Sequence, residues 1–578
     1  MKEIIDQKLT LLLIIFCIVF ILSISFCYPR IYINDEWISA NQLNHLMEGK
    51  NLLYGYEPYG EPAYAEAHRD ILCYTLALPI ISIPAYLLFT GFGDHFRLFM
   101  NILWIGLIFL VLLLIHRHFP RYTVYKGIPW TYGVYGSSLI LFILNMWLYT
   151  PFSIGEYPEI AAIAFTNNLL FAGSMVLAFL IFRQILESEW WSLFGVVSVI
   201  CGSSYLFWAE VGKDHVLVLF FFLIFLYFFI SWIHSGSLLH LLSGYIGIGW
   251  VAWARPEVGA GLFIIAVVGG IILAYREGIV KEAKTFFCSF SVLFGAIPLF
   301  LNNFGVTGNI FTSPMAMGYQ RVSVSSVEIV TRQISTQFRF GFSDAGGFLQ
   351  AIYSIFFNPH QAKTAGIFQV SPISFLAVFF VILFVIFVVK KKKFFCSVLE
   401  KKVAILTLLV SIGIFLPYCR SLSMLGNDGG IVPDIRYLSL LYFPLIILGL
   451  LFLKKLEFDE QNLKKTLESF FWIGIVILPL SFIVLQACIG NRLVVQLYAV
   501  KLITYVLLGI VVVGIVLVIR KKMNKDQLQY ILPLLFIANC IWFLIVGYRF
   551  PSGIWAHYHF LLPVSNWARL IILKMFPW

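Results

Sequence analysis

The stretch LTLLLIIFCIVFILSISFC, residues 9–27, decides the fold class of this chain. It contains no charged residue, and its length is close to the roughly 20 mostly apolar residues that a helix needs to cross the hydrocarbon layer of a membrane. Similar apolar runs follow one another along the chain, separated by short basic segments. We therefore predict an all-α polytopic membrane protein, because a membrane barrel would show short segments of alternating polarity instead.

The composition supports this fold class and excludes several others. Of the 578 residues, 60% are hydrophobic and 12% are charged, and the mean hydropathy is +0.90, whereas about 25% of the residues of a soluble domain are charged. The net charge of +11 does not indicate a nucleic-acid partner, because the Lys and Arg residues lie mostly in short loops between apolar runs. The nine cysteines lie mostly inside apolar runs and form no CxxC pair, which indicates neither a disulfide framework nor a zinc site.

The distribution of basic residues predicts the topology, because loops rich in Lys and Arg stay in the cytoplasm. With a cytoplasmic N-terminus, every basic loop can lie on that side. These loops are His116 to Lys126, Arg183, Arg276 to Lys284, Lys390 to Lys402, Lys454 to Lys465 and Arg520 to Lys525. The segments left outside are 28–70, 150–159, 209–215, 255–257, 302–371, 419–433 and 549–578.

The apolar runs predict about 13 to 15 transmembrane helices. Between Ile71 and Ile115, two apolar stretches are separated by residues 91–97. They must make a single crossing if the loop that begins at His116 is cytoplasmic. We therefore expect one of the two to be a juxtamembrane or re-entrant helix.

Residues 1–578 are expected to form a single membrane domain, because the sequence shows no internal repeat and no soluble domain. Its external parts include the first external loop, 28–70, the large external loop, 302–371, and the external C-terminal tail, 549–578. The first of these is the candidate catalytic loop because it is the richest in polar groups.

Two adjacent carboxylates, Asp35 and Glu36, follow directly on the first apolar run. In the segment after them, helical spacing gathers polar side chains on one face and directs Leu43, Leu46 and Met47 toward lipid, as in an interfacial helix. Acidic residues commonly cap helix N-termini, so Asp35 could serve only that role. A carboxylate whose pKa is raised by burial could also accept a proton from an incoming hydroxyl group.

The same loop ends in His68, Arg69 and Asp70. Arg69 could anchor the chain to lipid headgroups. Its guanidinium could equally form a pair of charge-assisted hydrogen bonds with a phosphate. His68 is a candidate for contact with the substrate.

Six stretches, in this order along the chain, carry a family resemblance. They are NDEWISANQLNHLMEGKNLL (34–53), GEYPEIAAIAF (155–165), WARPEVGAGL (253–262), LNNFGVTGNIFTSPMAMGY (301–319), GIFQVSPISFLA (366–377) and DIRYLSLLYFPLI (434–446). Together they resemble the GT-C superfamily of membrane glycosyltransferases, which includes protein O-mannosyltransferases and lipid A aminoarabinose transferases. The resemblance implies a GT-C type fold with external juxtamembrane helices.

The resemblance also implies roles for particular residues. Asp35 matches the catalytic Asp of the superfamily, and Glu36 matches the acidic residue beside it. Arg69 falls where the aminoarabinose transferases carry a basic residue for the polyprenyl phosphate, although their Lys-Pro-Pro pattern is absent here. Glu156 and Glu159, kept as candidate substrate contacts, fall in the second external loop, where many members carry an acidic residue and the oligosaccharyltransferase branch uses one for a metal. Because this loop has neither D-x-D nor D-N-E, a divalent metal is possible but not indicated, and no cofactor is expected.

The implied reaction transfers a hexosyl or pentosyl group from a polyprenyl-phosphate donor to a glycan, lipid or protein acceptor at the extracytoplasmic face of the cell membrane. Such a site needs a carboxylate for the acceptor and a cation for the leaving phosphate. Direct displacement inverts the anomeric carbon, and a double displacement would need a carboxylate nucleophile. The donor supplies the free energy, so no ATP site is required.

Three further charged groups lie at predicted external helix ends. Lys213, Asp214 and His215 favour an interfacial salt bridge, with Asp214 kept as a candidate substrate contact. Arg255 and Glu257 flank Pro256, and we expect them to pair with each other. Arg436 begins an apolar run, where it could contact lipid headgroups or the donor phosphate.

Two other classes of membrane protein fit parts of the pattern. A transporter or flippase should place ionisable residues and broken helices near the middle of the bilayer, whereas the charges here gather at one face. An O-antigen-type polymerase or ligase depends on a large late loop rich in Arg, and 302–371 contains Arg321, Arg332 and Arg339. Both classes stay open as alternatives.

Overall fold

The computed structural model describes most of the chain. The segments outside the described residues are 1, 28–35, 50–74, 125–126, 128, 152–157, 276–278, 314–344, 359–364, 391–393, 395–396, 416, 419–433, 490–491, 550–561, 566, 568–570 and 572–578. Within the described residues the named elements are all helices, and Ala365 and Asp434 form an isolated parallel bridge.

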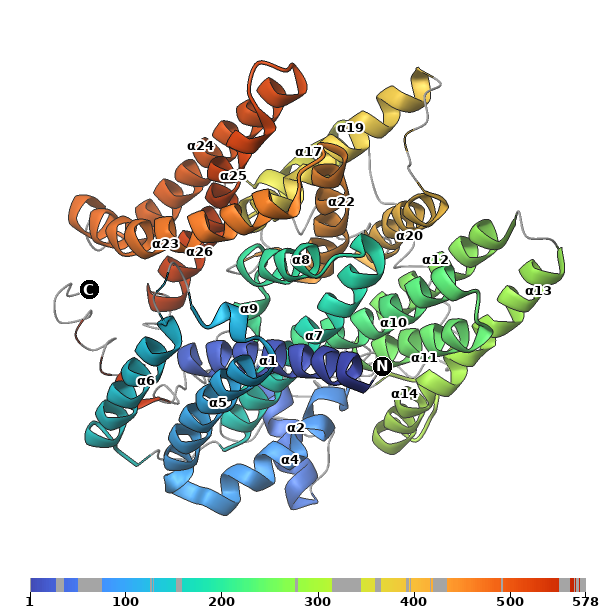
Figure 1. Ribbon diagram of the computed structural model, residues 1–578. Coiled ribbons are helices and arrows are strands. Elements are labelled where there is room, and N and C mark those ends of the chain that lie inside the picture. Colours follow the sequence, from blue (N-terminus) through green and yellow to red (C-terminus); the bar gives the residue numbers. More distant parts are fainter. Residues whose placement is uncertain are drawn as a thin grey trace.

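The helices form two groups that meet along α8 and where α12 packs against α20 (Figure 1). The first group is α1 (Lys2–Phe26), α2 (Glu36–Glu48), α4 (Ala77–Phe92), α5 (Phe96–His118), α6 (Trp130–Trp147), α7 (Pro158–Leu186), α8 (Glu189–Cys201), α9 (Tyr205–Trp208), α10 (His215–Ser235), α11 (Leu238–Ala254), α12 (Pro256–Ala274), α13 (Ile279–Cys288) and α14 (Val292–Thr307). The second group is α17 (Ala345–Phe357), α18 (Ile367–Val370), α19 (Leu376–Val389), α20 (Val398–Phe415), α22 (Tyr442–Lys455), α23 (Glu460–Ile489), α24 (Leu493–Ile519), α25 (Leu528–Ile531) and α26 (Pro533–Arg549).

Ten helical runs in the described residues are long and apolar enough to cross a membrane, and α8 and α11 are shorter apolar helices. Three further helices, α6, α20 and α26, pack against these runs through α5, α12 and α24. The expected 13 to 15 spans stay a prediction, because ten runs in the described residues have the length and composition of a span. The expectation of an all-helical polytopic membrane protein is therefore confirmed for the described residues.

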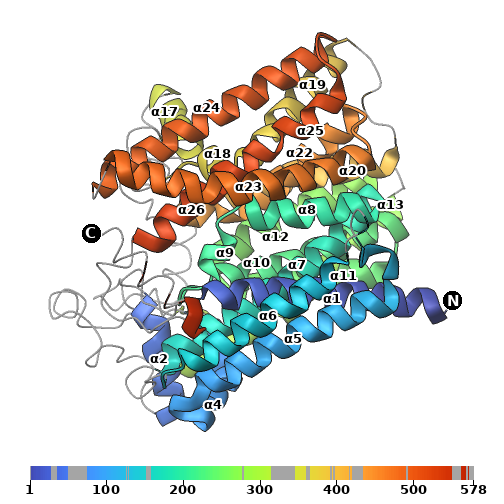
Figure 2. The same ribbon diagram turned by 60° about the vertical axis from the view of Figure 1, so that its left-hand side comes forward.

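The apolar region from Ala77 to His118 bends between α4 and α5. The break is a short 3-10 turn, Gly93–His95, in which Gly93 has a φ of +52°, a backbone conformation that favours glycine. Phe89 and Phe96 stack across the bend, with ring centroids 3.3 Å apart. In Figure 2, α5 runs beside α1, while α4 lies with α2 toward the end of the bundle away from the N-terminus. This arrangement agrees with a juxtamembrane role for α4.

Leu43 of helix α2 is buried in the protein instead of facing lipid, which corrects the expectation for this residue, whereas Leu46 and Met47 are partly buried. Leu43 is fully buried in the main core together with Ala40, and Ile38 is buried as well. Asn41 and Gln42 are buried as well, because α2 packs against α4 and α7. Periodicity identified the helix but not the neighbours that cover Leu43.

Small residues bring α11 and α14 into close contact. A Cβ atom on Gly295 would lie 2.0 Å from the Ile246 carbonyl oxygen, and one on Gly249 would lie 2.4 Å from the backbone of Gly295. Such approaches are typical of membrane helices, where backbone contact replaces the hydrophobic driving force. The packing fixes the end of α11, from which Arg255 extends.

Polar contacts gather at two opposite ends of the bundle. Lys455 pairs with Glu400 at 2.8 Å, and Lys525 pairs with Glu457 at 3.4 Å, in loops that were all predicted to be cytoplasmic. Most contacts of the site described below lie within or next to segments that were predicted to be external. These contacts agree with the predicted grouping of the loops into two faces, and which face is cytoplasmic stays a prediction.

Candidate functional site

A short turn between α9 and α10 forms the floor of the site. Asn167 in α7 donates from Nδ2 to the carbonyl oxygens of Val211 and Lys213, at 2.8 and 2.9 Å. From the other side, the Gly212 amide donates to Oε2 of Glu36 at 3.2 Å. Glu36 is fully buried at the first residue of α2. The turn therefore connects the start of the first external loop's helix with the helix bundle.

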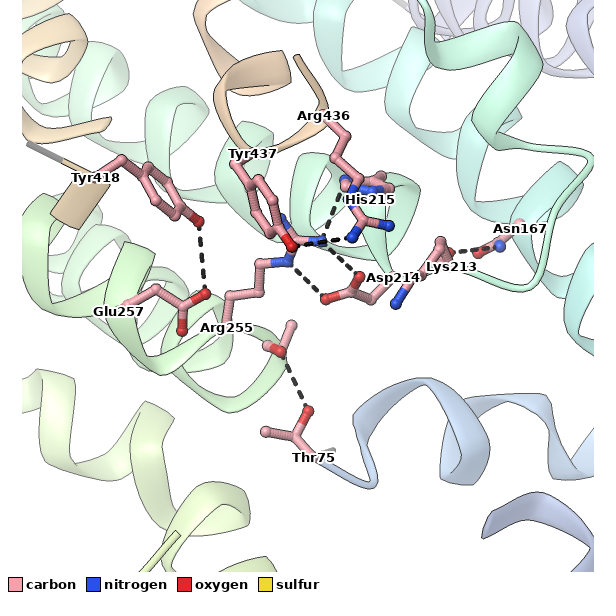
Figure 3. A network of polar contacts seen from close by, with 11 residues as sticks. Thr75, Asn167, Lys213, Asp214, His215, Arg255, Glu257, Tyr418, Arg436 and Tyr437 are labelled. Carbon is pink, nitrogen blue, oxygen red and sulfur yellow. Dashed lines mark hydrogen bonds and ion pairs between the residues drawn. The ribbon is translucent and has the colours of Figure 1, made fainter. Parts of the chain in front are cut away.

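Asp214 and Arg255 form a two-point ion pair across this face (Figure 3). Arg255 donates from Nε and Nη2 to the two carboxylate oxygens of Asp214, at 2.8 Å each. Burial acts to raise the pKa of Asp214, but the Arg255 charge and its hydrogen bonds hold it below the ordinary value. Burial acts to lower the pKa of Arg255, and Asp214 raises it well above its ordinary value. Both groups are therefore charged at neutral pH.

Aromatic and polar side chains surround this ion pair. Nη2 of Arg255 lies 3.2 Å from Nδ1 of His215, and its guanidinium lies 5.9 Å from the ring centroid of Tyr437. The Tyr418 hydroxyl donates to Oε1 of Glu257 at 3.5 Å. Burial and the Glu257 charge raise the pKa of Tyr418 well above its ordinary value, so this phenol keeps its proton.

Arg436 enters the site from the second group of helices. It begins the 3-10 helix η7, Arg436–Leu441, and is 4% exposed. Its Nη2 donates to the Tyr437 hydroxyl at 2.9 Å, and its guanidinium lies 4.9 Å from the centroid of that ring. Figure 3 shows Arg436 and Tyr437 above His215 and Arg255. The guanidinium groups of both arginines therefore lie near the same aromatic ring, that of Tyr437.

An apolar groove opens beside this cluster, with a volume of about 370 Å³. Its lining includes Leu76, Trp253 and Leu301, and its polar lining residue Asn302 accepts a hydrogen bond from the Leu76 amide at 2.6 Å. Thr75 donates to the Ala254 carbonyl oxygen at 3.1 Å, next to Arg255. The groove therefore begins within a few residues of the charged cluster.

The cluster can bind an anion and accept a proton. Lys213, Arg255 and Arg436 contribute three buried or largely buried cations from three separate segments. Guanidinium groups match the geometry of phosphate oxygens, and their attraction for an anion is stronger where water is partly excluded. Glu36 contributes a carboxylate at the same turn.

The structure brings together three of the residues predicted for the site, Glu36, Asp214 and Arg436. Glu159 lies elsewhere, in the first turn of α7, and is 1% exposed. It interacts electrostatically with Glu48 and Tyr86. The remaining predicted site residues, Asp35, His68, Arg69 and Glu156, lie outside the described residues.

The pairing of the charged motifs differs from the prediction. Asp214 was expected to pair within its own motif and Arg255 with Glu257, but the structure pairs Asp214 with Arg255. Asp214 lies at the start of α10 and Arg255 at the end of α11. Spacing within one segment cannot show that these two helix ends meet. Arg255 was therefore missed as a site residue, although its position at a predicted external helix end was the available signal.

Among the described residues, no group of three or more His, Cys, Asp or Glu side chains could hold a metal ion. The expectation that the reaction needs no metal stays a prediction.

Comparison with known proteins gives one similar structure. No protein-family model and no curated protein matches the chain. Among solved structures, the chain is similar to the crystal structure of ArnT from Cupriavidus metallidurans bound to undecaprenyl phosphate. The TM-score is 0.47 and the sequence identity is 10%, over 93% of this chain and 78% of that chain.

Proposed function

We propose that this protein is a GT-C type glycosyltransferase that moves a sugar from a polyprenyl-phosphate donor to an acceptor at the extracytoplasmic face of the cell membrane. One observation carries the proposal. The hydrogen bond between Glu36 and the Gly212 amide holds the first external loop's helix against the turn that carries Lys213 and Asp214. A carboxylate and three cations from four distant segments thereby meet at one end of the bundle.

The proposed reaction assigns each charge a task. The acceptor hydroxyl oxygen attacks the anomeric carbon, and the bond from that carbon to the phosphate oxygen breaks. The acceptor proton passes to a carboxylate, for which Asp35 is proposed as general base, with Glu36 next to it in the sequence. The bonding electrons leave with the polyprenyl phosphate, whose growing negative charge needs cations.

Arg436 and Arg69 are the proposed ligands of the donor phosphate, and the geometry supports adding Arg255 and Lys213. Arg255 is already paired with Asp214, which fixes its guanidinium in one orientation. Preorganised charges stabilise a transition state without reorganising during the reaction. Asp214, Glu156, Glu159 and His68 remain proposed contacts of the sugar or acceptor.

The apolar groove at Leu76 and Trp253 is the proposed site for part of the donor's lipid chain. Its lining is almost wholly apolar, and it starts beside Arg255. A lipid phosphate held at the cations would bring its chain to this position. The reaction uses the free energy stored in the donor, and no cofactor is proposed.

Transfer assays with purified variants test this function. The wild type should transfer sugar from at least one of a panel of radiolabelled polyprenyl-phosphate sugars to mixed membrane acceptors. Asp35→Asn should lower kcat by roughly 10²- to 10⁴-fold, and Arg436→Ala should raise the KM for the donor. Lys525→Ala, at the opposite end of the bundle, is the matched control. Variants that all keep wild-type kinetics would place the chemistry elsewhere.

A further inference from the structure

We propose that Asp434 is a positioning residue that fixes Arg436 relative to Arg255. This inference rests on the proposed function. Asp434 is fully buried and lies two residues before Arg436, at the bridge to Ala365. Its hydrogen bonds go to residues that are not proposed substrate contacts, so its role would be exerted through its neighbours.

Three donors from two segments hold the Asp434 carboxylate. The hydroxyl groups of Ser204 and Tyr442 donate to Oδ2 at 2.5 and 2.9 Å. The indole of Trp208 donates from Nε1 to Oδ1 at 3.2 Å. A buried carboxylate is tolerated when such donors replace its water. Asp434 therefore joins the segment around α9 to the start of η7.

Trp208 extends this anchor to the ion pair. Its ring centroid lies 4.2 Å from that of His215, and Nδ1 of His215 lies 3.2 Å from Nη2 of Arg255. Asp434 is thus connected to Arg255 through Trp208 and His215. It is connected to Arg436 through two peptide bonds.

The positions of Arg255 and Arg436 therefore both depend on Asp434. Their guanidinium groups lie 5.9 and 4.9 Å from the centroid of Tyr437, which η7 also carries. Movement of η7 would separate Arg436 from Arg255, whose place is fixed by Asp214. A phosphate bound by both arginines would then lose one of its contacts.

The chemistry of the anchor defines a conservative and a disruptive substitution. In Asp434→Asn, the amide oxygen can accept from Trp208, and the amide nitrogen can donate to the hydroxyl groups of Ser204 and Tyr442, which accept as well as donate. This variant keeps three hydrogen bonds. Asp434→Ala removes all of them.

The test measures donor KM, kcat and thermal stability for both variants. Asp434→Ala should raise the donor KM by roughly tenfold or more, while Asp434→Asn stays within about threefold of wild type. Combining Asp434→Ala with Arg436→Ala should raise KM little beyond Arg436→Ala alone, because both act on one contact. A folded Asp434→Ala variant with wild-type KM, or fully additive effects, would overturn the proposal.

A structure of the Asp434→Ala variant separates this inference from the proposed function. We expect Arg436 to lose its hydrogen bond to Tyr437, whether or not the wild type transfers sugar. An unchanged Arg436 would refute the positioning role. An inactive wild type, together with a displaced Arg436 in the variant, would refute the glycosyltransferase function and leave the anchor established.

Discussion

Removing the charge of Asp214 should destabilise the folded protein strongly. Asp214→Asn keeps the size of the side chain but leaves the Arg255 guanidinium without the carboxylate that it contacts at 2.8 Å through two nitrogens. The side chains of Arg255 and Asp214 are only 11% and 24% exposed, so water replaces the lost charge poorly.

The magnitude follows from the geometry. Two unit charges about 4 Å apart interact by about 4 kcal/mol at an effective dielectric constant of about 20, and breaking a buried pair typically costs about 3–5 kcal/mol. The amide can still accept one hydrogen bond from Arg255, and both side chains are slightly exposed. We therefore expect a loss of about 3 kcal/mol, near the lower limit.

The assay is the free energy of unfolding of the purified protein, measured by denaturation in mixed micelles. Glu457→Gln is the matched control because it removes the same charge from the exposed Lys525–Glu457 pair, whose side chains are 39% and 86% exposed. That substitution should cost less than about 1 kcal/mol. Equal losses for the two variants would refute the view that Asp214 and Arg255 form a buried ion pair.

Three further predictions test the packing, the electrostatics and the topology. Gly295→Ala should destabilise the protein by about 1–3 kcal/mol because its Cβ would lie 2.0 Å from the Ile246 carbonyl oxygen. The control Gly305→Ala, in the same helix, meets no atom within 4 Å and should leave the stability unchanged or raise it. Equal stabilities of the two variants would contradict the close packing. Burial, opposed by the three hydrogen bonds, raises the pKa of Asp434 from 3.8 to about 6, so the folded state binds this proton more tightly than the unfolded state. Lowering the pH from 7.5 to 5 should therefore stabilise the wild type relative to Asp434→Asn by about 1 kcal/mol in thermal unfolding, and a pH-independent difference would count against it. In a background in which Cys73, Cys396, Cys419 and Cys488 are replaced by Ser, an impermeant thiol reagent added to sealed right-side-out vesicles should label Phe311→Cys but not Glu457→Cys, and the reverse pattern would invert the topology.

The arrangement of the loops followed from the sequence because it depends on charge alone. The basic segments near Lys455 and Lys525 were assigned to one face, and those near Asp214 and Arg436 to the other, and the contacts agree with both groups. Each assignment needed only the order of apolar and basic residues along the chain. The order of apolar and basic residues is therefore enough to assign a loop to one end of the bundle or the other.

The contacts within the site could not be predicted in the same way. The pairing of Asp214 with Arg255 depends on which helix ends meet, and the burial of Leu43 depends on neighbours in α4 and α7. Asp434 lay in a stretch that carried the family resemblance, but its partners Ser204 and Trp208 lie more than 200 residues earlier in the chain. Helical periodicity reports one helix at a time and contains no information about such partners.

The most direct test of the central claim is the turnover of lipid-linked sugar by the purified wild-type protein in lipid vesicles. Polyprenyl-phosphate sugars, labelled in both the sugar and the lipid, would be supplied with mixed membrane acceptors. We expect one free polyprenyl phosphate for each sugar that reaches an acceptor, with both products lost in a folded Asp35→Asn variant. Movement of intact lipid-linked sugar between the leaflets, without release of polyprenyl phosphate from any donor, would contradict the account and identify a transporter.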